Sequence, residues 1–479
     1  LYMIPLYFKK DFLANFIHMA FGMGTALLIY TYLKNKINGM AGLLGMLIFL
    51  STPIVVRLST QAYVDLGLAF FTTASFLAFV RYRDGHFGDV KWLLISALMM
   101  GLALGTKYNA LIVWFFLSAA IIFLYARDTG QQGNALKNGL FFFLISLLIF
   151  SPWLIKNTVL TGNPFYPLFK GIFNFTTMTT QDGAYSMVSG QTTGGIFQWR
   201  ETVYGETFWD TALIPIRYFF QGQDNVQRYF DGVLNPVLII FAPFALINKS
   251  FRRDTIFLIC FCVFFLLVAT FLDQTRIRYI LPVVPFLSIL AVTGFIDMSN
   301  WMMKLSTTLR ILGVTILTSI FIVLMTQNLF YIKNYYQSIS PMNYVLGKES
   351  REEFITRHNS GYAAIKYINT HTPEHARIRL ILFAGRGYYL DRLYAEGLHY
   401  GISDIVTLVA HVNDDESFRS SLRSLDCTHL LIRTYLFEKY LRDNYTPDTC
   451  MLFFKRMNKA AKVIYNQDGC TVYELMPQS

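Results

Sequence analysis

Four charged side chains stand at the edges of apolar runs, where a charge is costly and therefore tends to serve a function. Asp65 opens the run in "QAYVDLGLAFF", and Lys107 lies in the turn of "GLALGTKYNAL". Arg276 and Arg278 precede the apolar part of "DQTRIRYILPVVPFL". Cations of this kind hold and neutralise a leaving phosphate, and a carboxylate takes a proton from an acceptor hydroxyl. The set therefore suits chemistry on a lipid-linked phosphate.

Each of these residues also has a purely structural interpretation. The helix dipole favours a carboxylate at the start of a helix, and for Asp65 this alternative carries about the same weight as the functional one. A lysine such as Lys107 can extend its ammonium group to the membrane surface. The dipole disfavours cations at a helix N-terminus, so Arg276 and Arg278 need an anionic partner or the same route to the surface.

The stretch "SPWLIKNTVLTGNPFYPLF" (151–169) directly follows an apolar run. Pro152 is expected to disturb the last turn of the preceding helix, and Gly162-Asn163-Pro164 is expected to force a turn. We interpret the stretch as a structured rim over a lipid-facing cavity. Lys156 and Asn157 are the members that we expect to touch a ligand.

The elements that position these residues are apolar helices. Hydrophobic residues make up 54% of the 479 residues and charged residues only 15%, whereas about a quarter of a soluble domain is charged. A helix needs about 20 apolar residues to cross a bilayer. We predict ten such helices, of which those beginning at 92 and 234 are short. They cover approximately 12–33, 39–56, 62–80, 92–105, 109–126, 139–155, 234–247, 255–272, 279–296 and 310–330.

The net charge of +11 is interpreted as a signal of membrane topology and not of nucleic-acid binding. Basic residues concentrate in alternate loops, which the positive-inside rule places in the cytoplasm. The short loops of the opposite set contain only Arg57, Lys107, Arg276 and Arg278. The candidate residues, the loop 156–233 and the chain after 331 are therefore expected outside the cytoplasm. The cytoplasmic set consists of Lys34, Lys36, Arg81, Arg83, Lys91, Arg127, Lys137, Lys249, Arg252, Arg253, Lys304 and Arg310.

The loop 156–233 is far longer than an ordinary connection between helices. Its many aromatic and apolar residues argue against disorder. They favour short amphipathic helices that lie on the membrane surface.

The chain after 331 has the pattern of a connector (332–354) followed by a small extracytoplasmic α/β domain (355–479). We predict parallel strands at 378–385 and 428–434 with helices on the sheet, and a closing hairpin that turns at Asp468-Gly469. The predicted helices cover 360–369, started by Ser360, and 415–425. The fold class is thus a polytopic α-helical membrane protein with about ten transmembrane helices and a C-terminal α/β domain.

Two motifs of this domain give little chemistry. Gly385-Arg386-Gly387 lacks the other residues of a nucleotide-binding loop and is predicted to be a plain turn. The three cysteines of the domain match no metal site, and one disulfide among them is possible. They are Cys427, Cys450 and Cys470.

Five motifs in this order resemble the bacterial membrane glycosyltransferases of the C-type fold. They are closest to family 39, which includes the protein O-mannosyltransferases and the aminoarabinose transferase. The resemblance covers residues 1 to about 330. The motifs are "AYVDLGLAFF", "GLALGTKYNAL", "SPWLIKNTVLTGNPFYPLF", "FDGVLNPVLIIFAPFAL" and "RIRYILPVVPFL".

The resemblance implies transfer of a sugar from a polyprenyl-phosphate donor, with inversion, to a lipid, glycan or protein acceptor. The reaction would take place at the outer face of the bacterial cytoplasmic membrane. Asp65 corresponds to an acidic position of the family, Lys107 to the lysine of its turn, and Arg278 to the arginine before its double-proline helix. Residues expected to position substrate are Tyr63, Tyr108, Trp153, Lys156, Asn157, Asn163 and Tyr166, and Arg276 is expected to join Lys107 and Arg278 at the phosphate.

The family's usual catalytic acid lies in the first outer loop, between the first two spans. We expect that loop and one preceding helix to be missing before Leu1, so the usual base is not identifiable in this sequence. A requirement for a divalent metal ion is left open, although no metal-binding motif is present. The expected partners are the lipid donor and membrane lipids, with no nucleic acid. The alternative function is a non-catalytic membrane scaffold that retains the fold, and a transporter is disfavoured because two matching halves are not seen.

Overall fold

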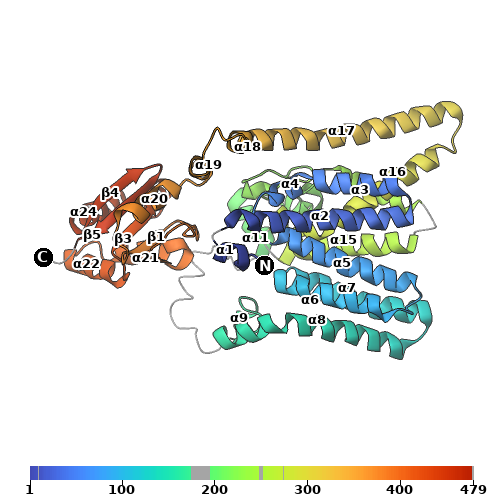
Figure 1. The fold of residues 1–479 in the computed structure, drawn as a ribbon, viewed down its shortest axis with the longest axis horizontal. Helices are drawn as coiled ribbons and strands as arrows, with labels where there is room; N and C mark the ends of the chain where they lie inside the picture. Colours follow the sequence, from blue (N-terminus) through green and yellow to red (C-terminus); the bar gives the residue numbers. More distant parts are fainter. Residues whose placement is uncertain (9, 174–194, 248–251, 273–274, 477–479) are drawn as a thin grey trace. The chain divides into compact units, whose positions relative to one another are not determined.

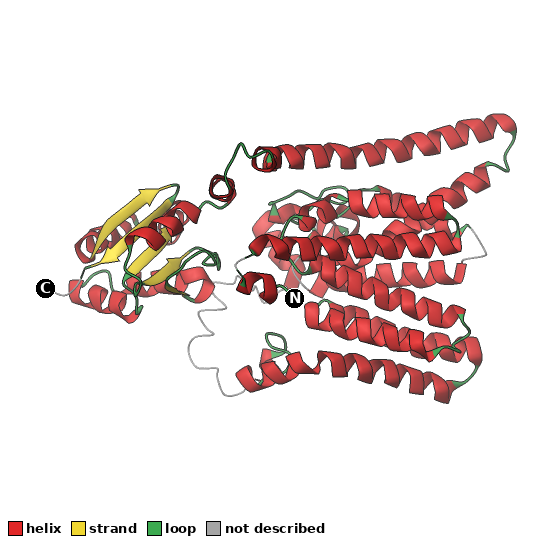
Figure 2. Ribbon diagram, in the orientation of Figure 1, coloured by secondary structure: helices red, strands yellow, loops and turns green. Residues whose placement is uncertain are grey.

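The computed structural model describes residues 1–8, 10–173, 195–247, 252–272 and 275–476. The chain divides into two compact units, Leu1–Tyr335 and Tyr336–Ser479. In the described residues the first unit consists of helices, and all the strands lie in the second (Figures 1 and 2). The unit boundary lies close to the predicted end of the membrane domain at 331.

The first unit is a bundle of long apolar helices, of which α2 to α8 follow one another through short connections (Figure 1). Neighbours in sequence pack side by side, as α5 does with α6 and α7 does with α8. The long elements are α2 (Asp11–Lys36), α3 (Gly39–Ser51), α5 (Asp65–Asp84), α6 (Val90–Thr106), α7 (Ala110–Thr129), α8 (Gln132–Thr161), α15 (Arg252–Leu272), α16 (Val284–Met302) and α17 (Thr307–Ile339). Short elements are α1 (Met3–Tyr7), α4 (Pro53–Ser59), α9 (Lys170–Phe173), α11 (Gly195–Tyr204), α12 (Phe208–Ala212), α13 (Ile214–Arg217), η1 (Gln227–Tyr229), α14 (Val237–Ile240), η2 (Ala242–Leu246) and η3 (Ile277–Val283).

Helices lie at all ten predicted positions, but they are not ten equal spans. Six helices of the described residues are long and apolar enough to cross a membrane, and a seventh candidate is the pair α3 and α4, bent by 67°. The runs predicted to be short form the 17-residue α6 and the pair α14 and η2. The multi-span architecture is therefore supported, while the number of crossings stays a prediction.

Close packing in the bundle depends on small residues where helices meet. A Cβ atom added to Gly294 of α16 would lie 1.9 Å from the carbonyl oxygen of Phe241, and one added to Gly101 of α6 would lie 2.5 Å from Ile149 of α8. Membrane helices commonly use small residues in this way to bring their backbones together. These two contacts fix how α16 and α6 pack against their neighbours.

Pro152 does not lie in the last turn of its helix as expected, because α8 continues through it to Thr161. Proline lacks the N–H group that would bond the carbonyl of Leu148. The hydroxyl of Ser151 donates to that carbonyl at 2.7 Å instead, so the carbonyl keeps a partner. The helix ends at Gly162, which has a φ of 71°, a left-handed conformation that glycine adopts without strain. The second predicted break, at Gly162-Asn163-Pro164, is thus confirmed.

Ion pairs tie together the loops at the end of the bundle far from Asp65. Lys36 lies 3.0 Å from Asp84 and 2.7 Å from Asp254. Arg83 lies 2.7 Å from Asp128. The ends of α2, α5 and α7 and the start of α15 therefore meet at one end of the bundle, as expected for loops that share one side of a membrane.

The second unit is an α/β fold around a five-stranded sheet with the order β2-β1-β3-β5-β4. β1 pairs in parallel with β2 and β3, and β4 and β5 form the closing hairpin. Asp468 and Gly469 form the hairpin turn with φ of 53° and 71°, as predicted. The strands are β1 (Arg377–Ile381), β2 (Leu393–Glu396), β3 (His429–Arg433), β4 (Ala461–Gln467) and β5 (Cys470–Leu475). The helices are α18 (Pro341–Val345), α19 (Arg351–His358), α20 (Tyr362–His371), α21 (Leu398–Ala410), α22 (Asp415–Ser424), α23 (Thr434–Asn444) and α24 (Pro447–Ala460).

Some details of this unit differ from the prediction. Ser360 does not start α20, since the helix is preceded by Gly361 and Ser360 accepts a hydrogen bond from Arg433 instead. The predicted connector 332–354 is largely helical, because α17 continues to Ile339 and is followed by α18 and α19. All five cysteines are free thiols, so the disulfide considered for this unit is not formed. Gly385-Arg386-Gly387 lies in a turn and loop, as predicted.

Candidate functional site

Asp65 and Lys107 form a buried ion pair where α5 begins and α6 ends. The Lys107 ammonium lies 2.6 Å from a carboxylate oxygen of Asp65. Asp65 is 1% exposed, whereas the Lys107 side chain retains 20% exposure. Asp65 is the first residue of α5, and Lys107 follows the last residue of α6 in an extended conformation. The two predicted site residues, 42 positions apart, are therefore brought into direct contact.

Tyr279 joins Arg278 to this pair. The Lys107 ammonium lies 4.2 Å from the centre of the Tyr279 ring, and the Arg278 guanidinium lies 5.2 Å from the same centre. The guanidinium also lies 4.9 Å from the ring centre of Tyr63. Cations are attracted to aromatic faces at these distances. Asp65, Lys107, Tyr279, Arg278 and Tyr63 thus form one continuous cluster, which we call the cation cluster.

The two cations of the cluster differ in how they are neutralised. Lys107 has its carboxylate partner in Asp65. Among the described residues no carboxylate lies within 4 Å of the Arg278 guanidinium, whose one side-chain hydrogen bond there is a long contact of 3.4 Å with the Tyr279 hydroxyl. Its Nε atom is buried and has no hydrogen-bond partner in the part of the chain that the structure describes. A partly buried guanidinium in this state has a positive charge that no described carboxylate contacts, and it has unused donors, which suit an anion.

Tyr2, near the start of the chain, contacts the cluster through the backbone of Tyr63. Its hydroxyl donates to the carbonyl oxygen of Tyr63 at 2.5 Å. Burial raises the pKa of Tyr2 to about 12, and the negative charge of Asp65 contributes to the rise. The hydroxyl therefore remains protonated at neutral pH and acts as a donor.

His18, which the sequence interpretation did not single out, holds the turn between α4 and α5. Its Nδ1 atom lies 2.9 Å from the carbonyl oxygen of Leu58 and 2.8 Å from that of Gln61. Its Nε2 atom accepts from the backbone N–H of Leu66 at 2.9 Å. The sequence shows His18 only as a single histidine in an apolar run. Its hydrogen-bond partners are distant in sequence, so its role could not be predicted from spacing.

The rim 151–169 is fixed by its two asparagines. Asn157 donates to the Tyr108 hydroxyl at 3.0 Å and to the Pro164 carbonyl at 3.2 Å, and the Tyr108 hydroxyl donates to the Tyr166 carbonyl at 2.5 Å. Asn163 is fully buried and donates to the carbonyl of Leu168 at 2.6 Å. Asn157, Asn163, Tyr108 and the backbone of Tyr166 thus brace the turn, and Tyr108 directly follows Lys107 in the chain.

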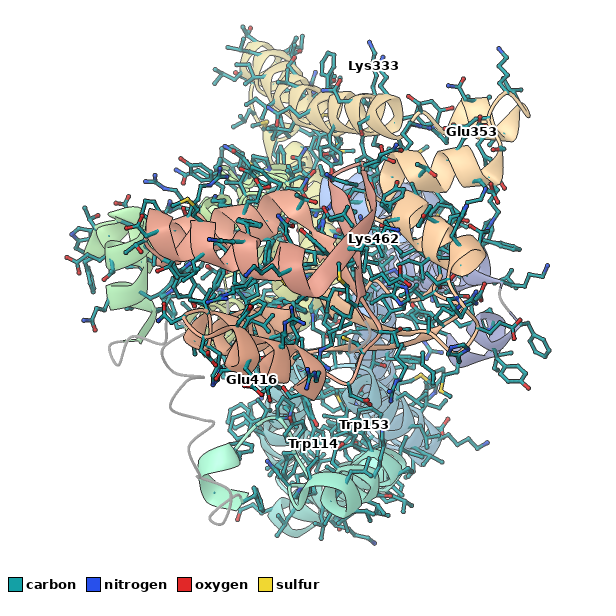
Figure 3. All side chains as sticks on the ribbon, turned by 90° about the vertical axis from the view of Figure 1, so that its left-hand side faces the viewer. Trp114, Trp153, Lys333, Glu353, Glu416 and Lys462 are labelled. Atoms are coloured by element: carbon teal, nitrogen blue, oxygen red, sulfur yellow. The ribbon has the colours of Figure 1, made fainter. Side chains whose placement is uncertain are left out.

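Trp153 and Lys156 lie apart from the cation cluster. The Lys156 ammonium stacks 4.4 Å from the Trp153 ring centre, and both side chains are exposed on α8 (Trp153 is labelled in Figure 3). Among the described residues, no hydrogen bond, ion pair or ring contact joins either residue to Asp65, Lys107 or Arg278.

Arg276 belongs to a second ion cluster. Its guanidinium lies 4.0 Å from the carboxylate of Asp231, which also pairs with Arg57 at 3.0 Å. Arg57 in turn pairs with Asp224 at 2.8 Å, and Asp224 accepts from the hydroxyl of Tyr331 in α17. Arg276 is therefore already balanced by a carboxylate, unlike Arg278 two residues later.

A third ion cluster, also missed from the sequence, orders the described part of the long loop. Arg200 donates to both carboxylate oxygens of Glu206 at 2.6 and 2.9 Å, and both side chains are buried. Burial raises the pKa of Glu206, but hydrogen bonds from Arg200 and Arg217 outweigh it and hold that pKa below its usual range. Arg200 also donates to the hydroxyl of Thr275, close to Arg278 in the chain. Apolar side chains are exposed on α12 and α13, and the position of these helices on a membrane surface stays a prediction.

The described residues contain no group of three or more His, Cys, Asp or Glu that could hold a metal ion. The charged clusters described above each combine carboxylates with lysine or arginine. This composition suits ion pairing and anion binding.

Comparison with known proteins supports the predicted resemblance. Residues 3–155 match the family described as dolichyl-phosphate-mannose-protein mannosyltransferase. A search of curated proteins found no match. ArnT from Cupriavidus metallidurans, whose solved structures include one bound to undecaprenyl phosphate, is similar to this chain at 17% identity, with a TM-score of 0.50 in the apo state. That similarity covers 98% of this chain and 85% of ArnT.

The archaeal oligosaccharyltransferase AglB from Archaeoglobus fulgidus is also similar. Its structure in complex with an inhibitory peptide and a dolichol-phosphate matches at 11% identity with a TM-score of 0.52. The match covers 98% of this chain and 65% of AglB. The chain has the same fold as these two proteins.

The part of this chain that matches the mannosyltransferase family contains some residues of the cation cluster. Tyr63, Asp65 and Lys107 lie within 3–155, as does the start of the rim. Arg278 and Tyr279 lie outside it and join the cluster only through the fold. The glycosyltransferase resemblance drawn from five sequence motifs is thus confirmed by a family match over its first part and by fold similarity over the rest.

Proposed function

We propose that the protein transfers a sugar from a polyprenyl-phosphate-linked donor to an acceptor, and that the cation cluster binds the phosphate of the donor. The family match and the glycosyltransferase fold support the reaction class. The observation that carries the site is Arg278, a guanidinium between two aromatic rings with no carboxylate within 4 Å among the described residues.

A lipid phosphate fits this position by charge and by geometry. The guanidinium offers planar, paired donors to phosphate oxygens, and the Lys107 ammonium on the same ring supplies a second positive charge. Both cations can stabilise the negative charge that develops on the departing phosphate when the bond to the sugar breaks. The Tyr63 and Tyr279 rings limit the freedom of the cations, so little reorganisation is needed at the moment of reaction.

The geometry favours a positioning role for Asp65 over the predicted catalytic role. Its carboxylate is almost fully buried and already paired with Lys107. Because the Asp65 side chain is only 2% exposed, an acceptor hydroxyl has little access to either of its carboxylate oxygens. We propose that Asp65 holds Lys107 in its orientation toward the Tyr279 ring. We also propose that Arg276, balanced by Asp231, does not bind the phosphate.

We further propose that the cation cluster faces the outer side of a bacterial cytoplasmic membrane, where the second unit would also lie. The support is the distribution of basic residues. Lys36 and Arg83 lie at the opposite end of the bundle in ion pairs with Asp84, Asp254 and Asp128, and a positive bias marks the cytoplasmic side. Inversion at the sugar carbon remains the expectation from the family resemblance.

The test is binding of undecaprenyl phosphate to the purified full chain in lipid nanodiscs, compared with uncharged undecaprenol. Replacing Arg278 by alanine should weaken binding of the phosphate lipid by about 10- to 100-fold, since hydrogen bonds to charged groups contribute about 1.5–3 kcal/mol. Arg276→Ala is the matched control, because that arginine is two residues away and already has a carboxylate partner. Equal effects of the two substitutions would contradict the site, and equal binding of both lipids would contradict the donor class.

A non-catalytic scaffold with the same fold is separated from the enzyme by a transfer assay. Undecaprenyl-phosphate-linked sugars carrying a radiolabel would be incubated with membranes that contain the full chain or its Arg278→Ala variant. The enzyme releases labelled sugar from the lipid only with the native residue. A scaffold binds the lipid without releasing sugar in either case.

A further inference from the structure

His18 is a fully buried polar residue whose hydrogen bonds are all made to one distant turn. It lies on α2 and is 0% exposed. Its ring contacts the carbonyl oxygens of Leu58 and Gln61 and the N–H group of Leu66. Burying a polar ring is costly unless its nitrogens are paired. The three contacts therefore account for how the imidazole is accommodated inside the bundle.

The partners determine which nitrogen carries the proton. Nδ1 faces two carbonyl oxygens, which only accept hydrogen bonds, so Nδ1 carries the hydrogen. Nε2 faces the backbone N–H of Leu66, which only donates, so Nε2 presents its lone pair. The ring is thus neutral, with a donor on one side and an acceptor on the other.

The contact with Leu66 replaces a missing helix cap. The first N–H groups of a helix have no partner within the helix. The N-cap residue of α5, Val64, makes no side-chain capping hydrogen bond. Leu66 is the second residue of α5, so His18 supplies from α2 the acceptor that a capping side chain would otherwise supply.

The turn held in this way carries two members of the cation cluster. Gln61 and Leu66, both bonded to His18, bracket Tyr63 and Asp65 in the chain. Tyr63 lies against the Arg278 guanidinium, and Asp65 pairs with Lys107. A shift of the turn therefore displaces the neighbours of both cations at once.

We propose that His18 is a positioning residue for the lipid-phosphate site, acting through the turn 58–66 and not by contact with the ligand. This inference rests on the proposed function for the identity of the ligand. The positioning itself is a property of the turn and is measurable without any ligand.

Three substitutions separate the two sides of the ring. His18→Gln places an amide oxygen near the position of Nε2 and preserves the cap on Leu66. His18→Asn places an amide group near Nδ1 and preserves only the contacts with the carbonyl oxygens. His18→Phe removes both. Thr25→Val is the matched control, because Thr25 is buried on the same helix and bonds only the carbonyl of Phe21 within that helix.

The first measurement is amide hydrogen exchange of peptides that cover residues 60–68 in the full chain, without ligand. We expect at least tenfold faster exchange of this segment in His18→Asn and His18→Phe, and exchange within threefold of the native protein in His18→Gln and Thr25→Val. Exchange that is unchanged in His18→Asn would overturn the capping of α5. If His18→Phe does not fold, the comparison of His18→Gln with His18→Asn decides the result.

The second measurement is binding of undecaprenyl phosphate in nanodiscs. Positioning predicts that His18→Asn weakens binding at least fivefold, that His18→Gln restores it to within twofold, and that both variants melt within a few degrees of each other. Native affinity in His18→Asn, with Arg278→Ala still defective, would overturn the positioning role and leave the proposed function intact. No binding by the native protein would instead overturn the proposed function, and hydrogen exchange would then decide the positioning of the turn alone.

Discussion

The Asp65–Lys107 pair predicts an unequal response to removal of its two charges. The Asp65 side chain is 2% exposed and the Lys107 side chain 20% exposed. Replacing Asp65 by asparagine leaves Lys107 with access to solvent and with the face of Tyr279 at 4.2 Å. Replacing Lys107 by methionine leaves a carboxylate buried with no cation within 4 Å among the described residues. The second change should therefore be much the more costly.

The magnitudes follow from burial. Removing one partner of a buried ion pair costs about 3–5 kcal/mol, because the other charge is left unpaired. Lys107→Met should fall in that range. Asp65→Asn should cost less, about 1–2 kcal/mol, because the remaining Lys107 charge is not left without support. The Tyr279 ring stabilises it by about 1–2 kcal/mol, and the exposed part of the lysine stays hydrated. In the double variant no charge is left buried, so its stability should exceed that of Lys107→Met.

The effect of Asp65→Asn should thus change sign with the background. It destabilises the native chain and stabilises the Lys107→Met variant. The assay is thermal denaturation of the four purified full-length proteins in the same detergent, with loss of the monodisperse fraction as the readout. If Asp65→Asn lowers the melting temperature in both backgrounds, the carboxylate is not the buried partner of Lys107 and the proposed positioning role is wrong.

Three further predictions test other parts of the site. Asn157→Ala should destabilise the protein by about 1–3 kcal/mol in thermal unfolding, because it removes the donor that braces the rim. Trp153→Ala, at an exposed position, should change the stability by less than about 0.5 kcal/mol. Although burial raises the pKa of Glu206, hydrogen bonds from Arg200 and Arg217 lower it below its usual range, so these contacts stabilise the fold above the carboxyl's ordinary pKa of 4.5. The stability should fall as the pH drops below that value, and this part of the fall should be absent from thermal melts of Glu206→Gln over about pH 3–7. Asn235→Leu should weaken the attachment of α17, since Asn235 donates at 2.6 Å to Asn328 of that helix; a cost near 0.6 kcal/mol per bond in membrane proteins predicts a small drop in melting temperature and faster proteolysis of α17.

Most of the fold could be predicted from the sequence, because helices that cross a membrane are recognised by the length and apolarity of their sequence. All ten runs became helices, and the parallel strands and final hairpin of the second unit lie within or close to the predicted ranges. The error at Pro152 has a physical cause. A proline breaks a helix when its missing hydrogen bond is not replaced, and whether Ser151 supplies the replacement depends on its rotamer and not on the sequence pattern.

The site was predicted less completely, because pairing between distant residues cannot be read from spacing. Asp65, Lys107 and Arg278 were chosen by their position at helix ends, and the fold brings all three together. Tyr279 was overlooked, although it connects the two cations. His18 was overlooked as well, because a single histidine in an apolar helix gives no indication of the turn it holds.

The partners of the predicted cations also narrow where a phosphate can bind. Lys107 is held by Asp65, Arg276 by Asp231, and Lys156 is exposed against a tryptophan ring. Arg278 differs from all of them, because its neighbours among the described residues are the aromatic rings of Tyr63 and Tyr279 and not a carboxylate. Aromatic rings attract a positive charge but do not neutralise it. A partly buried charge of this kind is costly without an anion and is stabilised when one arrives. Asp65 is paired with Lys107 and does not contact the Arg278 guanidinium. At the proposed site a phosphate would therefore meet a guanidinium whose donors are still available.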